Sequence, residues 1–428
     1  TSMFKPSNYK NYVKFKDADV KNTFQKVIDE FEPDVIFWSA ISSHIHSEGE
    51  YVNIQNGYDL LKNINTRNAL KITGGLQATS SPEMVFKNLP KIDYLIMGES
   101  EKVLSEVADK IDLKEEIKNV NGIAYVKNKK IIKNSKQIII SNLDEISPYD
   151  YDIFEDQIFF RPYNGEVVRA VDYEMSRGCI YSCSYCVETV IQDYYGFKEY
   201  SDKTGAIKNF KNYLRNKSAK TIFEEVEYLV QKKKINFIRC QDTNFLTNDR
   251  SILYDLSQKI KKSKLDFKMY IETRPEGINE ISIKLLKDLK VDGVGMGVEL
   301  AAEEFREENL HRFASQKKTI DAFKMLKDNG IKRTSYNVIG FPEQNEESIL
   351  QTIEFNKLIN PDNITVAYYS PYAGTGQQAK GLKNQTFEDY EFDADAALRS
   401  KSKSKVLSIS KLDYYKKNFV NLARSWKV

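Results

Sequence analysis

Long apolar runs, cysteines and an excess of charge are all scarce in this chain of 428 residues. No stretch approaches the ~20 apolar residues of a membrane-spanning helix, and residues 1–12 lack the apolar core of a signal peptide. Four cysteines in this length do not resemble the disulfide framework of a secreted protein. The net charge of +3 is small and does not argue for a polyanionic partner. We therefore expect a cytoplasmic protein with no membrane span and no nucleic-acid partner.

The first 112 residues show strands and helices in alternation. The apolar pattern predicts strands at 33–39, 69–75 and 92–99, and helices at 20–31, 82–89 and 100–111. Such alternation is typical of a doubly wound parallel sheet, whose ligands bind beyond the carboxyl ends of the strands. We therefore expect one ligand-binding edge that contains Ser39, Gly74, Gly75 and Glu99.

The rest of the chain divides into three further parts. Residues 113–165 read as a hairpin, at 122–134, followed by a connector rich in Pro and Asp. Residues 166–385 contain six predicted strands, each separated from the next by a helix or by the cysteine-bearing segment, which indicates a partial (β/α)6 barrel. Residues 386–428 are predicted to be helical. The expected fold class is α/β, with a Rossmann-like domain at 1–112, a barrel and a small helical C-terminal region.

Three of the four cysteines lie in "SRGCIYSCSYC", with the spacing C-x3-C-x2-C. A structural zinc site needs four ligands, and only Cys240, His44, His46 and His311 remain to complete one. An iron–sulfur cube held by three thiolates leaves one iron open to a ligand from outside the protein. The loop of Cys179, Cys183 and Cys186 is thus a candidate [4Fe–4S] site.

This loop, with an aromatic residue before its last cysteine, resembles that of the radical S-adenosylmethionine (radical SAM) enzymes. The resemblance implies that S-adenosylmethionine binds the open iron and is cleaved to a 5′-deoxyadenosyl radical. It also implies contacts to this cofactor from residues at the strand ends of the barrel, namely Tyr185, Asp242, Glu272, Arg274, Glu299, Gly340 and Pro342. For Glu272 and Glu299, salt bridges that close the strand ends are the alternative.

The segments "PDVIFWSAIS" and "ITGGLQATSSPEMVF…IDYLIMGESEKVLSEV" resemble the cobalamin-binding domain that precedes the barrel in one branch of this superfamily. The resemblance implies cobalamin contacts from Ser39, Ser42, Gly74, Gly75, Thr79 and Glu99. Two features depart from the usual domain. The Asp-x-His-x-x-Gly signature is absent, so cobalt would have no lower histidine ligand, and the first strand and helix are missing before residue 11.

The sequence is therefore identified as that of a cobalamin-dependent radical SAM enzyme, which the resemblance implies to be a C-methyltransferase. It implies a metabolite substrate and an electron donor such as flavodoxin or ferredoxin. Three alternatives stay open: a radical SAM enzyme that has lost cobalamin, a methylthiotransferase and a non-enzymatic metal-binding module. The methylthiotransferases place three further cysteines before the barrel, and residues 1–178 contain none. Cys240 is either a buried core thiol or a substrate-facing group, and His44 and His46 lie near the predicted cobalamin edge.

Overall fold

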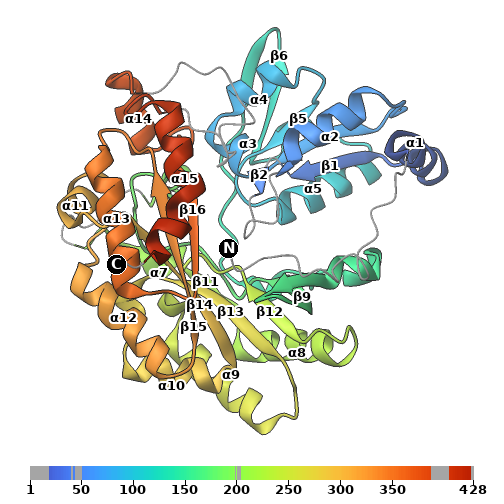
Figure 1. Cartoon of the computed structure of the whole chain (residues 1–428). Coiled ribbons are helices and arrows are strands. Elements are labelled where there is room, and N and C mark those ends of the chain that lie inside the picture. Colours follow the sequence, from blue (N-terminus) through green and yellow to red (C-terminus); the bar gives the residue numbers. More distant parts are fainter. Residues whose placement is uncertain are drawn as a thin grey trace.

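The computed structural model of this chain contains two large sheets, each covered by helices, and two short two-stranded ribbons (Figure 1). It describes residues 19–39, 42–43, 51–197, 199, 204–386 and 404–425. His44 and His46 lie outside these residues, and for Ser42 only the backbone is described. In the described part of the chain, no helix is long and apolar enough to cross a membrane.

The N-terminal sheet has five strands in the order β1-β4-β5-β6-β7. Strands β1 (Val35–Ser39), β4 (Leu70–Gly74) and β5 (Tyr94–Ile96) are parallel, while β6 (Ile123–Lys127) and β7 (Lys130–Lys133) form an antiparallel hairpin. Its helices are α1 (Val20–Phe31), α2 (Asn53–Lys62), α3 (Leu76–Ser80), α4 (Pro82–Asn88) and α5 (Glu101–Asp112). The predicted alternation is confirmed, and the hairpin at 122–134 extends the N-terminal sheet by pairing with β5.

The first strand differs from its prediction as a buried strand. β1 lies at the edge of the sheet, where it pairs with β4, and Phe37 is 37% exposed. Of the residues that form the apolar side of α1, only Ile28 is buried, whereas Val27 and Phe31 are largely exposed. The apolar runs correctly predicted strand β1 and helix α1. They did not predict how far the side chains of these two elements are exposed in the described structure. A short ribbon of β2 (Ser42–Ser43) and β3 (Tyr51–Val52) follows β1.

The second sheet has seven strands in the order β16-β15-β14-β13-β12-β9-β8. The six predicted strands are present and parallel: β9 (Glu166–Tyr173), β12 (Phe237–Cys240), β13 (Lys268–Thr273), β14 (Val291–Glu299), β15 (Lys332–Ile339) and β16 (Asn363–Tyr368). The additional strand β8 (Phe160–Tyr163) runs antiparallel to β9. Because β8 and β16 are the two edges, the sheet is an open, partial barrel, as predicted.

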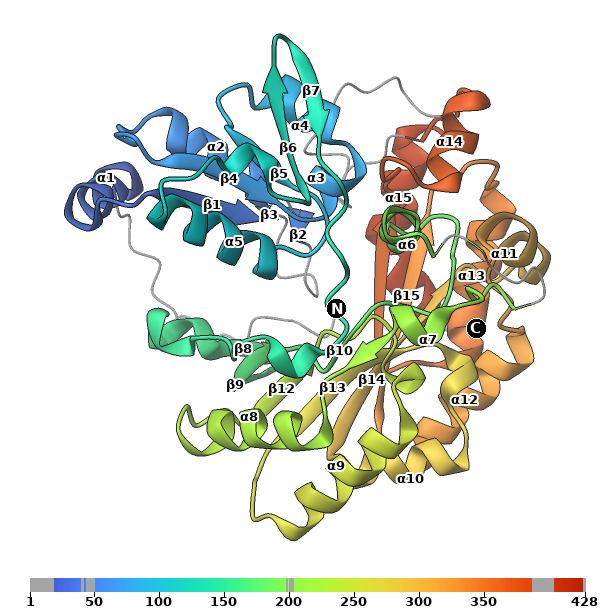
Figure 2. The ribbon, with the colours of Figure 1, turned by 180° about the vertical axis from the view of Figure 1, so that it is seen from behind.

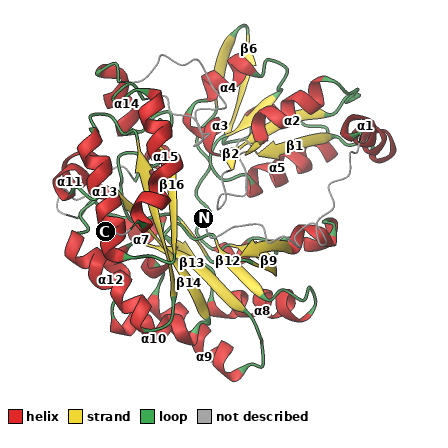
Figure 3. Ribbon diagram, in the orientation of Figure 1, coloured by secondary structure: helices red, strands yellow, loops and turns green. Residues whose placement is uncertain are grey.

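Helices cover the outer face of this sheet, as Figures 2 and 3 show. They are α8 (Ala219–Gln231), α9 (Arg250–Lys262), α10 (Glu280–Asp288), α12 (Gln316–Asp328) and α13 (Glu346–Ile359). Strand side chains alternate between the two faces, so Met269 and Ile271 of β13 join the core beneath these helices while Tyr270 and Glu272 face the barrel interior. The C-terminal helix α15 (Ile409–Arg424) packs on α13 and β16.

Candidate active site

The cysteine loop leaves the carboxyl end of β9. It starts after the two-residue strand β10 (Ser176–Arg177) and runs into helix α6 (Glu188–Tyr195). Cys179 and Cys183 are each 8% exposed, Cys186 is half-buried, and none of the three forms a disulfide. The loop is compact, because the Cys186 amide donates to the carbonyl oxygen of Cys183 at 3.0 Å.

Cys179 lies in an environment that disfavours its bare thiolate. Burial raises the pKa of Cys179 well above its usual range, and the charges of Glu188 and of the neighbouring thiols raise it further. The Arg274 guanidinium lies beside one of the thiols, with Nη1 3.8 Å from Cys183 Sγ. A bound cationic metal group would stabilise all three thiolates, so the donor set fits such a group.

The arrangement is compatible with a cluster. In the part of the chain that the structure describes, no three His, Cys, Asp or Glu side chains converge to hold one metal ion. A [4Fe–4S] cube binds one thiolate at each of separate irons, so its three cysteines need not converge on one point.

Arg274, which follows β13, reaches over the cysteine loop. Its guanidinium carbon lies 3.7 Å from the ring centroid of Tyr181, a cation–π contact, and Nη2 pairs with Glu276. The side chain is 8% exposed and its Nε atom is buried without a hydrogen-bond partner in the described structure. The predicted cofactor contact of Arg274 stays a prediction, but the structure brings this residue to the cysteines.

Tyr185 lies where the cysteine loop meets the end of β15. Its ring packs edge-on against Phe341 at 5.5 Å, and Gly340 and Pro342 flank that phenylalanine. Gly340 has a φ of +88°, which glycine adopts without strain. The predicted aromatic contact and the predicted fifth-strand segment are therefore neighbours.

Glu299 ends β14 in the same region, with Arg312 Nη1 3.8 Å from its carboxylate. Both side chains are buried, and burial and the charge of Glu299 raise the pKa of Tyr185 well above its usual range. Glu272 of β13 lies further from the strand ends, opposite Gly295 of β14, and accepts a hydrogen bond from Tyr336 at 2.8 Å. For Glu299 the salt-bridge alternative is thus seen, although the pair is long.

The cofactor contact of Asp242 stays a prediction, and its carboxylate is already hydrogen-bonded within the protein. Its carboxylate accepts hydrogen bonds from the amides of Met175 and Ser176 at 2.8 and 3.1 Å, and from Ser176 Oγ and Asn248 Nδ2 at 2.7 and 2.6 Å. Four donors occupy the carboxylate, which is 2% exposed. This geometry favours a role in fixing the segment between β9 and the cysteines over a contact with S-adenosylmethionine.

Cys240 is 1% exposed and packs in the core beneath the outer helices. Burial raises the pKa of its thiol well above its usual range. The interpretation as a core thiol is the one that this placement favours. His311 follows helix α11 (Glu303–Leu310) and, with Gly374 and with Ser182 and Ser184 of the cysteine loop, lines a cavity of about 210 Å³.

The predicted cobalamin contacts gather at one edge of the N-terminal sheet. Ser39 pairs in register with Gly74, the last residue of β4, and Gly75 has a φ of 111° before α3. Thr79 Oγ1 donates to the Gly75 carbonyl oxygen and accepts from the Gly98 amide, both at 2.8 Å. Thr79 therefore ties two strand-end loops together, and its cobalamin contact stays a prediction.

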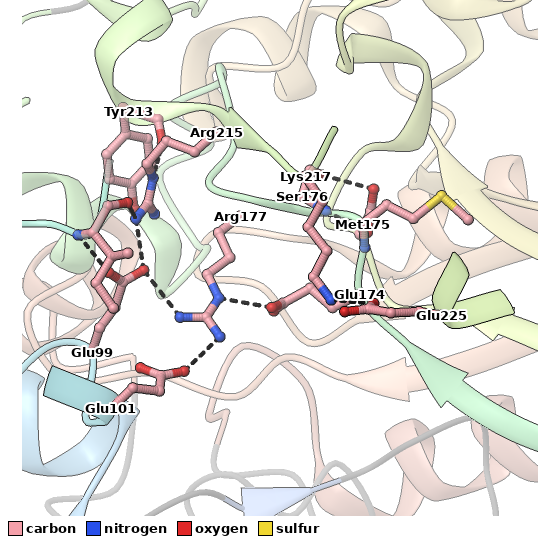
Figure 4. Close-up of polar contacts among 12 residues, drawn as sticks. Glu99, Glu101, Glu174, Met175, Ser176, Arg177, Tyr213, Arg215, Lys217 and Glu225 are labelled. Carbon is pink, nitrogen blue, oxygen red and sulfur yellow. Dashed lines mark hydrogen bonds and ion pairs between the residues drawn. The ribbon is translucent and has the colours of Figure 1, made fainter. Parts of the chain in front are cut away.

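Glu99 faces the cysteine loop rather than open space. One carboxylate oxygen accepts from Arg215 Nη1 at 2.8 Å and lies 3.5 Å from Arg177 Nη1, while the other accepts from the Ile140 amide at 3.0 Å (Figure 4). Sequence reasoning missed both arginines. Arg177, two residues before Cys179, was the available signal.

Two comparisons relate this chain to known sequences. The family model for the radical SAM superfamily matches residues 173–355. An uncharacterized methyltransferase of Pyrococcus horikoshii is 27% identical over 350 residues, which cover 82% of this chain and 70% of the relative. An anaerobic magnesium-protoporphyrin IX monomethyl ester cyclase of Rubrivivax gelatinosus is 25% identical over 375 residues, covering 85% of this chain and 62% of the relative.

Solved structures share the fold across both sheets. The radical S-adenosylmethionine methyltransferase TsrM of Kitasatospora setae, with tryptophan and an S-adenosylmethionine analogue bound, has a TM-score of 0.66 at 14% identity and covers 85% of this chain and 69% of its own. The cobalamin-dependent radical enzyme OxsB, with aqua-cobalamin bound, has a TM-score of 0.58 at 16% identity. The match covers 86% of this chain and 49% of the OxsB chain. The predicted fold class is therefore confirmed.

Proposed function

Because this chain belongs to the radical SAM superfamily, we propose that it is a cobalamin-dependent enzyme that modifies an unactivated carbon of a small-molecule substrate, most simply by methyl transfer. The observation that carries the proposal is the joint occurrence of two sites: two buried cysteines and one half-buried cysteine, none of them in a disulfide, beside the strand ends of the barrel, and a strand-end ligand edge in the N-terminal domain. When bound, the cluster and cobalamin supply reductive cleavage of S-adenosylmethionine and a transferable methyl group.

The residues around the cysteines fit S-adenosylmethionine, which carries a carboxylate, an ammonium group and an adenine. Four buried atoms here have no hydrogen-bond partner within the described structure: Arg274 Nε, Arg312 Nε, Glu276 Oε2 and Ser370 Oγ. Buried polar groups are rarely left without partners unless a ligand or water meets them. Arginines suit the carboxylate of the cofactor and acidic groups suit its ammonium, while Tyr185 and Phe341 offer apolar faces to the adenine.

The N-terminal edge fits a large ligand less completely. Gly75 adopts a backbone angle that favours glycine, and Gln77 Oε1, two residues on in α3, is buried without a partner among the described residues. In contrast, a side chain on Gly74 would meet Ser100 Oγ at 3.0 Å, so the close approach at Gly74 serves packing within the protein. Helix α3 packs against α6, which follows the cysteines, so the two proposed cofactor sites are neighbours.

Each residue set has a defined task in this proposal. The cysteine loop holds the cluster, and the barrel side chains orient S-adenosylmethionine beside it. The N-terminal domain covers the barrel mouth, which excludes water and brings the methyl donor to the reacting carbon. Because the cleavage is reductive, an outside electron donor such as a flavodoxin or ferredoxin is also needed.

Cyclisation is the second candidate reaction. Several relatives bear the name of an anaerobic cyclase, among them those of Rubrivivax gelatinosus and Cereibacter sphaeroides. The same cofactors and the same protein architecture serve either outcome. The two candidates differ in whether a methyl group appears in the product.

Anaerobic reconstitution tests the proposal. We expect about four irons per chain and, after cobalamin is added, an optical spectrum without histidine ligation to cobalt. The variant Cys183→Ala is expected to lose the cluster and 5′-deoxyadenosine formation, whereas the matched control Cys240→Ala keeps both. Full iron in Cys183→Ala would contradict the cluster assignment, and a cluster-loaded protein that takes up no cobalamin would leave only the cobalamin-free alternative.

A further inference from the structure

Two arginines face each other at the base of the cysteine loop. Arg177 of β10 and Arg215 of β11 (Arg215–Asn216) are directly paired residues of a two-stranded antiparallel ribbon. Like charges at directly opposed positions destabilise such a ribbon. The ribbon therefore needs an anion to hold it together, and the cysteine loop starts one residue after it.

The N-terminal domain supplies this anion. Glu99, between β5 and α5, places one carboxylate oxygen 2.8 Å from Arg215 Nη1 and 3.5 Å from Arg177 Nη1, so a single oxygen bridges the two guanidiniums (Figure 4). Arg177 also donates to Glu101 at 2.6 Å and to Glu174 at 2.7 Å. Glu101 belongs to the N-terminal domain and Glu174 to the barrel, so Arg177 links the two parts.

The central pair is well shielded from water. The Arg215 side chain is 7% exposed and that of Glu99 is 13% exposed. Besides Glu99, Arg215 donates to the carbonyl oxygens of Ile140 at 2.8 Å and Tyr213 at 2.9 Å. Removing one partner of a buried pair leaves an uncompensated buried charge, which costs far more than the loss of an exposed pair.

A chain of hydrogen bonds connects this pair to the first cysteine. Arg215 Nε donates to the Tyr213 carbonyl oxygen, and the Tyr213 hydroxyl donates to Glu188 at 2.7 Å. The same Glu188 oxygen accepts from the Cys179 amide at 3.0 Å. Gly178, which precedes this cysteine, packs closely against Tyr213, because a Cβ at position 178 would lie 2.5 Å from the Tyr213 carbonyl oxygen.

We propose that Glu99, Arg177 and Arg215 are positioning residues that couple the docking of the N-terminal domain to the conformation of the cysteine loop. While Glu99 contacts both Arg177 and Arg215, the loop adopts one arrangement relative to the N-terminal ligand edge. When Glu99 loses its charge, Arg177 keeps Glu101 and Glu174 while Arg215 loses the carboxylate that it pairs with, and the loop opens locally. The proposal rests on the proposed function only in that the three cysteines hold the cluster.

The test compares Glu99→Gln with Glu145→Gln in the full chain after anaerobic reconstitution. Glu145 of the connector forms an exposed ion pair with Lys102 of α5 at 3.3 Å and is therefore the control for the loss of a carboxylate charge elsewhere in this region. Two measurements are made: amide hydrogen exchange of the peptide 176–188, and the electron paramagnetic resonance spectrum of the reduced cluster with S-adenosylmethionine. No cobalamin is added, so a lost cobalamin contact cannot produce a change.

In Glu99→Gln we expect about tenfold faster exchange in this peptide and shifted g-values of the reduced cluster, at unchanged iron content. In Glu145→Gln we expect neither. The double variant Glu99→Gln/Arg215→Gln is expected to exchange no faster than Glu99→Gln, because residues of one network are not additive.

Native exchange and a native spectrum in Glu99→Gln would overturn the proposal, as would equal changes in Glu145→Gln. If Glu99→Gln does not fold, Glu101→Gln removes only the outer partner of Arg177; we expect a smaller change in the same direction, and no change would overturn the proposal. A wild-type chain that takes up no iron contradicts the proposed function instead. The exchange of the cluster-free chain still decides the coupling in that case.

Discussion

Replacing Asp242 separates its structural role from the predicted cofactor contact. Asp242→Ala removes the acceptor of four hydrogen bonds, two of them from the amides of Met175 and Ser176. A hydrogen bond to a charged group contributes about 1.5–3 kcal/mol, and the four bonds share one carboxylate, so their contributions do not add. We expect the free energy of unfolding to fall by about 3 kcal/mol or more, because several buried donors lose their acceptor and each unsatisfied group costs about 1–3 kcal/mol.

Asp242→Asn keeps one carbonyl oxygen for the two amides and loses the charge. We expect the free energy of unfolding of this variant to lie between those of wild type and Asp242→Ala. Asp249→Ala is the control, because Asp249 is exposed and caps helix α9 through Ser251; a lost cap costs about 1 kcal/mol. The measurement is anaerobic urea unfolding followed by circular dichroism, together with calorimetric titration of S-adenosylmethionine.

The two roles of Asp242 give opposite results in this pair of measurements. If Asp242 fixes the segment before the cysteines, stability falls with each substitution in the stated order. If it binds the cofactor, stability stays within about 0.5 kcal/mol of wild type, as for an ordinary surface change, while affinity falls about tenfold or more. The second result would refute the structural interpretation.

Two further predictions concern the N-terminal edge and the base of the barrel. Gly75→Val places a β-branched side chain at a φ of 111°, so we expect lost cobalamin uptake with unchanged iron content, measured by optical spectroscopy; retained uptake would exclude Gly75 from the site. Burial raises the pKa of Asp292, but the hydrogen bonds of Lys332, Lys268 and Tyr163 outweigh it and hold this pKa below its usual value near 3.8. The charged form is therefore the one that stabilises the fold. Asp292→Asn should lower the free energy of unfolding by a constant amount above pH 4, and the difference from wild type should vanish as the pH falls through the folded pKa; a difference that grows toward low pH would contradict this.

The barrel was predictable because its signals are local. Each of the six strands is a short apolar run followed by a polar or glycine residue, and the helices between them carry the helical period. Parallel strands bring such ends to one edge, so Arg274, Glu299 and Tyr185 were correctly placed near the cysteines. The spacing of these three residues along the chain did not predict the distances between their side chains.

The orientation of single side chains at those ends was not predictable. A carboxylate after a strand reads the same whether it meets a ligand or the backbone of a neighbouring segment. Asp242 turns to the amides of Met175 and Ser176 because these lie across from the end of β12. The register between β12 and β9 is fixed by tertiary packing, and the local sequence does not predict it. The hydroxyl of Thr79 is a similar case, since it joins two loops that are distant in sequence.

The contact between the two domains shows the same limit in its strongest form. Glu99 and Arg215 are 116 positions apart, and nothing in the sequence around Arg215 identifies it as the partner of Glu99. Still, the paired arginines carry a physical requirement that sequence reasoning could have used once the ribbon was known: two guanidiniums on opposed residues need a shared anion. The carboxylate that meets this need comes from the domain that holds the proposed second cofactor. Electrostatic necessity at the base of the cysteine loop thus gives a reason why the N-terminal domain docks at this place on the barrel.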